Sequence, residues 1–213
     1  AILREHHVDV MECLRDFFEN GQSAGYISLP TGSGKTILAT EIARVMGLKT
    51  VILSPTQIIL RQTGDTFNLQ PSEVTLSNFY QREKDLSGQV LNTTYQSFLI
   101  LLEKGAVKPQ DIELVISDEA HTALGEQRHK IFSQLANAML IGLTATPYFG
   151  PLEGFKKRGL ARESQPWVKL FRNCIHEISL EEAIEREILC KLDVQLVKTS
   201  TKVDEIEIRS GEY

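Results

Sequence analysis

The sequence predicts an α/β fold in which a parallel sheet carries helices on both faces. Short runs of aliphatic and β-branched residues alternate along the chain with longer segments whose apolar residues recur at helical spacing. The polar motifs of the chain follow directly after predicted strands. Because ligands of parallel sheets bind at the carboxyl ends of the strands, we expect these motifs to meet at one edge of the sheet.

Each element has its own signal in the sequence. The run at residues 50–53 is continuously apolar or β-branched, which is typical of a strand buried on both faces, and residues 112–117 are predicted to form a second buried strand. Gly47 and Gly105 follow helical patterns and are suited to end them. The predicted strands are 26–28, 50–53, 74–76, 90–93, 112–117, 139–143, 174–178 and 192–198. The predicted helices are 3–18, 35–46, 57–67, 96–104, 126–136 and 180–187. Residues 81–89 are predicted to form a loop or a weak helix, and 148–165 a mobile loop.

The composition is that of an ordinary globular chain. Of its 213 residues 42% are hydrophobic, enough to build a substantial core, and the longest apolar runs are too short to cross a membrane. The net charge of −5 argues against a basic domain that coats nucleic acid, so such contacts must be local or shared with a partner domain. No apolar leader follows Ala1, so we expect a cytoplasmic location, or one in the nucleoid or nucleus.

The cysteines are few and scattered. Cys13, Cys174 and Cys190 are odd in number and have no metal-binding spacing. We therefore expect three buried thiols in a reducing compartment.

The segment 29–36 (Leu-Pro-Thr-Gly-Ser-Gly-Lys-Thr) lies between a predicted strand and a predicted helix. Glycines without a Cβ let the backbone close around phosphate oxygens, and the N-terminus of the helix then faces the anion. Lys35 is predicted to reach the β- and γ-phosphates, and Thr36 to bind Mg²⁺. The other predicted nucleotide contacts in this loop are Thr31, Gly32, Ser33 and Gly34. Leu29 stands where the general pattern has glycine, and the alternative interpretation is a surface turn.

Two adjacent carboxylates, Asp118 and Glu119, follow the buried strand at 112–117. Nucleotide hydrolysis needs one group that holds Mg²⁺ and another that orients the attacking water. We assign Asp118 to the metal and Glu119 to the water, so that Lys35 and this pair form the predicted catalytic set. The alternative is an acidic pair that caps a helix.

Three motifs in this order resemble motifs I, II and III of the superfamily-two helicases and translocases. They are residues 31–36, the Asp-Glu-Ala-His sequence at 118–121 and the Thr-Ala-Thr-Pro sequence at 144–147. The last form is similar to the branch of restriction-enzyme translocase subunits and DNA-repair helicases. The resemblance implies the first RecA-like P-loop NTPase domain of an ATP-dependent helicase or translocase, with ATP and Mg²⁺ as cofactors. It also implies that His121, Thr144 and Thr146 couple the nucleotide state to the grip on nucleic acid.

The same resemblance implies contacts with the nucleic-acid backbone after two other predicted strands. Thr56, Arg61 and Gln62 lie in one such segment, and Thr94 and Ser97 in the other. A hydroxyl at a helix start can donate to a phosphate. The alternative is that these residues only cap helices.

Near the N-terminus, Arg4 and His7 align with a family element that reads the adenine edge, with His7 where relatives carry glutamine. Arg4 is predicted to stack on the base and His7 to hydrogen-bond it, although histidine lacks the bidentate geometry of an amide. The alternative is a solvated helix start. Towards the other end, Glu187 occupies a place where relatives usually carry glycine.

We expect residues 1–198 to form the ATP-binding domain, and 199–213 to form a tail or the start of a linker. No second set of motifs is present, so a second RecA-like domain is an expected partner, together with nucleic acid. The family motifs contact mostly phosphates, and the branch favours DNA over RNA. Two other functions remain open: a nucleotide-gated binding or scaffold domain without motor activity, and a P-loop phosphotransferase.

Overall fold

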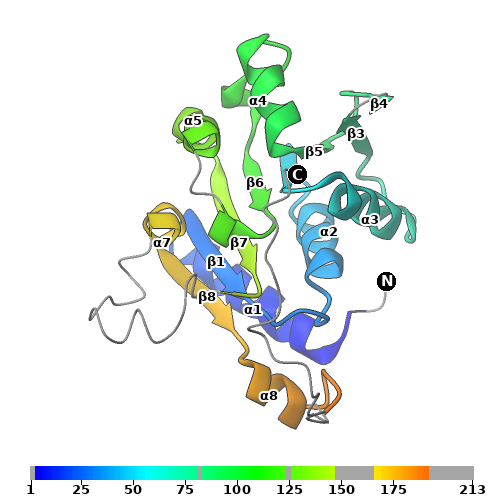
Figure 1. Cartoon of the computed structure of the whole chain (residues 1–213), viewed down its shortest axis with the longest axis vertical. Helices are drawn as coiled ribbons and strands as arrows, with labels where there is room; N and C mark the ends of the chain where they lie inside the picture. Colours follow the sequence, from blue (N-terminus) through cyan, green and yellow to red (C-terminus); the bar gives the residue numbers. More distant parts are fainter. Residues whose placement is uncertain (1–2, 81–82, 123–125, 147–165, 192–213) are drawn as a thin grey trace, which may run out of the picture.

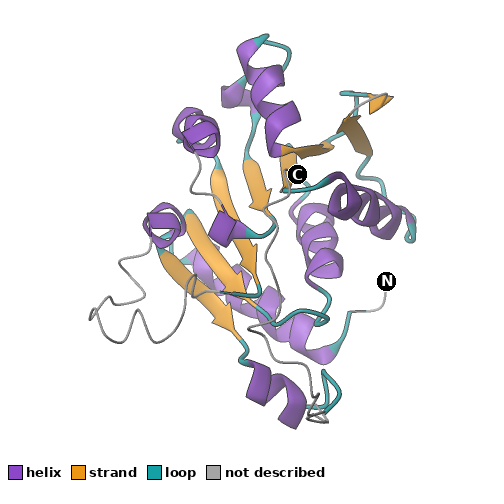
Figure 2. Ribbon diagram, viewed as in Figure 1, coloured by secondary structure: helices purple, strands orange, loops and turns teal. Residues whose placement is uncertain are grey.

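The computed structural model of the chain describes residues 3–80, 83–122, 126–146 and 166–191. Within these residues the strands form one eight-stranded sheet in the order β4-β3-β5-β2-β6-β7-β1-β8 (Figures 1 and 2). All neighbouring strands are parallel except β3 and β4, which are antiparallel. The strands are β1 (Ala24–Ser28), β2 (Thr50–Ser54), β3 (Leu76–Tyr80), β4 (Glu83–Lys84), β5 (Val90–Thr94), β6 (Leu114–Ser117), β7 (Met139–Thr144) and β8 (Asn173–Glu177).

Helices cover both faces of this sheet, which confirms the predicted α/β architecture (Figure 1). One face packs against α4, α5 and α7 through side chains such as Phe98, Ile131 and Phe171. The other packs against α1, α2, α3 and α8 through Leu14 and Leu38, among others. The helices are α1 (Glu5–Glu19), α2 (Lys35–Met46), α3 (Gln57–Asn68), α4 (Tyr95–Glu103), α5 (Glu126–Gln134), α7 (Pro166–Phe171) and α8 (Leu180–Glu185), with 3-10 turns η1 (Pro109–Asp111) and η2 (Ala120–Thr122).

The central strands are buried as their apolar sequences predict. Every residue of β2 and β6 is buried, because helices cover them on both sides. The edge strand β8 is more exposed, and Cys174 lies on it in contact with solvent. Cys190 is also exposed and Cys13 is half-buried, so the prediction of three buried thiols is wrong.

Three local predictions differ from the structure. The strand expected at 74–76 lies at Leu76–Tyr80, and the segment 81–89 contains the short strand β4 (Glu83–Lys84), which pairs with it. Helix α7 was not predicted, because six residues are too few to show helical periodicity. The predictions for 148–165, 192–198 and 199–213 fall outside the described residues.

Strand β8 lies beside β1 and covers what would otherwise be an open edge. Gly25 of β1 permits this approach, because a Cβ there would lie only 2.6 Å from Cγ1 of Ile175. After α8 the chain turns at Glu187, whose φ of +57° is in the left-handed region that favours glycine. Among the described residues, no helix is long and apolar enough to cross a bilayer.

Candidate active site

The loop at residues 29–36 joins β1 to α2 and lines a cavity of about 400 Å³. Gly32 and Gly34 have φ values of +87° and +94°, which a residue with a Cβ adopts only under strain. Gly34 is the N-cap of α2 and has no side chain to cap the helix. The first N–H groups of α2 therefore face this cavity as an anion site, as the motif predicts.

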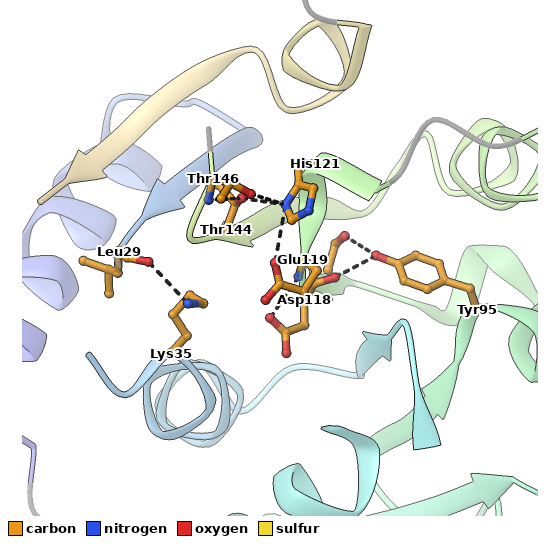
Figure 3. Close-up of polar contacts among 9 residues, drawn as sticks. Leu29, Lys35, Tyr95, Asp118, Glu119, His121, Thr144 and Thr146 are labelled. Atoms are coloured by element: carbon orange, nitrogen blue, oxygen red, sulfur yellow. Dashed lines mark hydrogen bonds and ion pairs between the residues drawn. The ribbon is translucent and has the colours of Figure 1, made fainter. Parts of the chain in front are cut away.

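Lys35 is the cation of this cavity. Its ammonium donates a hydrogen bond to the carbonyl of Leu29 at 3.3 Å (Figure 3). Burial lowers the pKa of Lys35, and the nearby charges of Glu119 and Asp118 offset part of this effect. The attraction between a cation and a phosphate is stronger when the cation is partly shielded from water than when it is exposed.

The beginning of the loop is fixed to the rest of the sheet. Leu29 is fully buried, and its N–H donates to the carbonyl of Thr144 at 3.0 Å. Ser33 is also buried, and its hydroxyl donates to the carbonyl of Pro30 at 2.8 Å. The side chain of Ser33 thus stabilises the loop, whereas Thr31 and Thr36 line the cavity together with the glycines and Lys35.

His7 does not lie where the sequence predicts. It is fully buried beneath the loop, with Nε2 2.9 Å from the carbonyl of Ser33 and Nδ1 accepting from the N–H of Arg4 at 3.3 Å. His6 Nε2 approaches the same carbonyl at 2.8 Å. Burial lowers the pKa of His7, which favours the neutral ring that this donor and acceptor pattern requires.

Both ring nitrogens of His7 are therefore engaged, and neither is left to read a base. The alternative, a solvated helix start, is wrong for His7 because His7 is buried. Arg4 is exposed, as that alternative predicts. Neither residue lines the cavity at the loop.

Asp118 and Glu119 lie at the end of β6 and line the same cavity as Lys35 (Figure 3). Burial, followed by the charge of Glu119, raises the pKa of Asp118. One oxygen of Asp118 accepts from the N–H of Glu119 at 2.9 Å. Glu119 has φ of +49°, a left-handed conformation that is costly for a residue with a side chain and that recurs at functional sites.

His121 connects the carboxylates to β7. Its Nδ1 lies 2.9 Å from the hydroxyl of Thr144, 3.2 Å from that of Thr146 and 3.4 Å from a carboxylate oxygen of Glu119 (Figure 3). Burial, followed by the charges of Arg128 and Lys35, lowers the pKa of His121, so the ring is neutral near pH 7. The contact with Glu119 is therefore polar rather than an ion pair. Pro147 lies outside the described residues.

A second polar cavity, of about 410 Å³, lies between the starts of α3 and α4. Thr56 and Thr94, the N-caps of these helices, both line it, together with Arg128 of α5. Thr94 accepts from the N–H of Ser97 at 3.2 Å and donates to its hydroxyl at 3.1 Å. The structure thus brings together the two segments predicted to contact nucleic acid. Thr56 and Thr94 also cap helices, which is the alternative role that the sequence suggested for them.

The other two predicted contacts lie elsewhere. Arg61 Nε donates to the hydroxyl of Tyr80 at 3.3 Å, and its guanidinium lies over the Tyr80 ring. Gln62 lines the cavity at the phosphate loop instead, one turn along α3 from Ile59. Neither residue lines the cavity that contains Thr56 and Thr94.

Two residues at this second cavity were missed. Arg128 lies nine positions after Glu119, and only the packing of α5 against α4 brings it to the cavity. Tyr95 immediately follows Thr94, and its aromatic side chain in a helical pattern is typical of an ordinary core residue. The sequence alone does not mark either residue as part of a site; only the packing of the helices shows it.

Comparison with known proteins agrees with this geometry. The family model described as "Type III restriction enzyme, res subunit" matches residues 1–149. The chain is 28% identical over 144 residues to "Putative ATP-dependent RNA helicase QP509L" of African swine fever virus (isolate Pig/Kenya/KEN-50/1950), covering 66% of this chain and 28% of that protein. It is 24% identical over 225 residues to the type I restriction enzyme SsaAORF53P endonuclease subunit of Staphylococcus saprophyticus, covering 99% of this chain and 23% of that subunit.

Solved structures share the fold. The Hef helicase domain of Pyrococcus furiosus superposes with a TM-score of 0.61 at 23% identity, over 82% of this chain and 37% of that one. The restriction-modification enzyme LlaGI, solved with a DNA substrate mimic, superposes with a TM-score of 0.67 at 20% identity, over 88% of this chain and 21% of that one. The chain thus spans only about a quarter of the curated relatives named here.

The predicted resemblance is confirmed: the fold is that of a first RecA-like domain of superfamily-two helicases, and the chain belongs to the family of type III restriction enzyme res subunits.

Proposed function

We propose that this chain is the ATP-binding domain of a helicase or translocase that couples ATP hydrolysis to movement on nucleic acid. The observation that carries the proposal is the convergence of Lys35, Asp118 and Glu119 on one cavity at the carboxyl edge of the sheet. A phosphate loop and a carboxylate pair in one cavity are the parts that nucleotide hydrolysis requires.

The residues present fit ATP with Mg²⁺. The N–H groups of the loop would hold the triphosphate, and Lys35 would bind its β- and γ-phosphates. Thr36 and Asp118 would hold Mg²⁺, which would neutralise phosphate charge. Glu119 would orient the attacking water, since it lines the same cavity as Lys35. Base contacts by His7 are not part of the proposal.

His121, Thr144 and Thr146 couple the nucleotide site to the nucleic-acid site. The support is the hydrogen bonding of His121 to both hydroxyls and its contact with Glu119. Thr144 also accepts, through its carbonyl, the N–H of Leu29 at the entry of the phosphate loop. A change at the nucleotide therefore reaches β7 through two sets of bonds.

Nucleic acid binds the second cavity through its phosphates, at Thr56 and Thr94, with Ser97 beside Thr94. DNA is the proposed substrate: LlaGI was solved with a DNA substrate mimic, and a relative from Eremothecium gossypii is named "ATP-dependent DNA helicase MPH1". QP509L is named an RNA helicase, so the deciding experiment compares both polymers. Arg61 and Gln62 lie away from this cavity, so Arg61 is proposed only as an outlying contact, and Gln62 faces the nucleotide instead.

A second RecA-like domain is proposed to supply the arginines that complete the ATP site. The motor would work where its nucleic acid is, in the cytoplasm, nucleoid or nucleus. An arginine finger typically accelerates hydrolysis by about 10³–10⁵-fold, so this chain alone should hydrolyse ATP slowly. Fast turnover by the 213-residue chain at saturating ATP would contradict this part of the proposal.

The deciding experiment measures ATP hydrolysis by the protein that carries both RecA-like domains, with and without single-stranded DNA or RNA. We expect polynucleotide to stimulate hydrolysis, and Glu119→Gln to spare ATP binding while abolishing turnover. Stimulation by neither polymer would favour the phosphotransferase interpretation. ATP binding that alters nucleic-acid affinity without any turnover would favour the scaffold.

A further inference from the structure

Tyr95 is a buried ionisable residue that the proposed function does not use. It is the first residue of α4, and only 5% of it is exposed. Its hydroxyl lies 2.6 Å from the hydroxyl of Ser117 and donates to the carbonyl of Asp118 at 3.2 Å (Figure 3). Burial raises the pKa of Tyr95 to about 12, so the phenol keeps its proton at all physiological pH values.

The directions of these two hydrogen bonds follow from the groups involved. A carbonyl can only accept, so the single proton of the phenol goes to Asp118. The hydroxyl of Ser117 must then donate to the phenolic oxygen. Tyr95 is therefore bonded to the main chain of the residue that we assign to Mg²⁺, one peptide before Glu119 and its left-handed backbone.

The ring of Tyr95 lies at the second cavity. It lines this cavity with Thr56 and Thr94, and the guanidinium carbon of Arg128 lies 4.2 Å from its ring centroid. One side chain thus contacts Arg128 of the candidate phosphate site through its ring and the main-chain carbonyl of Asp118 through its hydroxyl. In Figure 3 it reaches Asp118 from the side opposite to the hydroxyls of Thr144 and Thr146.

We propose that Tyr95 is a positioning residue that transmits phosphate binding at the second cavity to the main chain of Asp118 and Glu119. This inference rests on the proposed function. A phosphate held by the N-terminus of α4 and Arg128 changes the position of the guanidinium over the ring. The phenol carries this change to the Asp118 carbonyl, and a small rotation of the following peptide redirects the carboxylate of Glu119.

This route is separate from the one through His121. It runs from α4 and α5 to the end of β6, whereas His121 connects the end of β6 to β7. The two routes meet at residues 118 and 119. Loss of the phenolic hydroxyl should therefore weaken the coupling between the two ligands while leaving each binding site in place.

The test uses Tyr95→Phe in the 213-residue chain, which keeps the ring and its stacking with Arg128. The probes are a non-hydrolysable ATP analogue with Mg²⁺ and single-stranded oligonucleotides of deoxythymidine and of uridine. The Kd of the analogue is measured without and with saturating oligonucleotide, and the ratio is the coupling factor. Couplings between sites are typically about 5- to 150-fold and are reciprocal, so the oligonucleotide Kd gives an independent check.

We expect Tyr95→Phe to change each separate Kd by no more than about twofold and to reduce the coupling factor by about 2- to 10-fold, the equivalent of one net hydrogen bond. Ser117→Ala removes the hydroxyl that donates to the phenolic oxygen, so the phenol is held less firmly against the Asp118 carbonyl. It should lower the coupling factor in the same direction, which keeps the test decisive if Tyr95→Phe does not fold. The matched control is Thr63→Val, which removes a buried hydroxyl that donates to the carbonyl of Ile59 within α3. It should leave the coupling factor unchanged.

An unchanged coupling factor in Tyr95→Phe and Ser117→Ala, or an equal loss in Thr63→Val, would overturn the inference. So would a wild-type chain that binds both ligands without coupling, although the proposed function would stand. A wild-type chain that binds neither oligonucleotide would also overturn the inference, whereas the proposed function is tested separately by polynucleotide-stimulated hydrolysis in the protein that carries both RecA-like domains.

Discussion

Replacement of Lys35 by methionine should affect thermal stability differently with and without nucleotide: it should not lower the Tm of the ligand-free protein, but it should remove most of the Tm increase that nucleotide causes. Methionine keeps the length and apolar stem of the side chain and removes the ammonium. Burial is the largest cause of the lowered pKa of Lys35, so the fold holds this charge at a cost relative to water. The ligand-free variant should therefore unfold at the same temperature as the wild type, or a higher one.

With nucleotide the expected effect is a loss. Charge-assisted hydrogen bonds contribute about 1.5–3 kcal/mol, so the Kd for ATP should rise roughly 10- to 150-fold. A ligand at a hundredfold excess over its Kd stabilises the wild type by about 2.7 kcal/mol. For a chain of this size, that is a Tm increase of roughly 5–11 °C. If the Kd rises a hundredfold, the same concentration stabilises the variant by only about 0.4 kcal/mol, or roughly 1 °C.

The assay is thermal unfolding with and without an ATP analogue and Mg²⁺. Lys104→Met, at the exposed C-cap of α4, is the control and should keep the full shift. A Lys35→Met protein that keeps the wild-type shift would refute the assignment of the phosphate loop. A ligand-free Tm well below that of the wild type would refute the argument that burial of the ammonium is costly.

Three further predictions concern stability. Glu187→Gly removes a left-handed strain of about 1–2 kcal/mol at the cost of more chain entropy on folding, so the Tm should rise by roughly 1–4 °C in a melting scan; a lower Tm would contradict it. Asp118→Asn should raise the free energy of unfolding at pH 7, because the raised pKa of Asp118 means that the fold disfavours its charge. In denaturant titrations this gain should shrink as the pH is lowered towards 3.8, the ordinary pKa of aspartate. A gain that does not depend on pH would argue against this cause. The pKa of His7 is lowered, so the stability contributed by its neutral ring is complete above 6.5 and is lost as the pH falls below that value. His7→Gln keeps a donor and an acceptor, and the unfolding free energy of this variant should fall less steeply than that of the wild type from pH 7.5 to 5.5. An identical slope would show that His7 does not cause the pH dependence.

The fold and the centre of the site could be predicted because they depend on local patterns. Buried parallel strands have continuously apolar sequences, and a phosphate loop has a fixed spacing between glycines and lysine. Parallel strands then bring Lys35 and Asp118 to one edge, whatever the exact strand order.

The remaining features depend on packing between distant elements. Gln62 and Arg61 are neighbours in sequence but point to different surfaces of α3, and only the position of α2 and β3 decides which one reaches the nucleotide cavity. Arg128 reaches the second cavity because α5 packs on α4. His7 was assigned to a base because its position matches a family glutamine, yet its ring lies beneath Gly34, where a Cβ would be 2.9 Å from it.

The pairing of β8 with β1 has a consequence for where this domain can be cut. The family match ends at residue 149, before the strand that lies against the phosphate-loop strand. A truncation there would remove Ile175 from Gly25 and leave β1 with an unpaired row of N–H and C=O groups, a surface prone to association with other chains. The smallest stable unit should therefore extend through α8, beyond the end of the family match at residue 149.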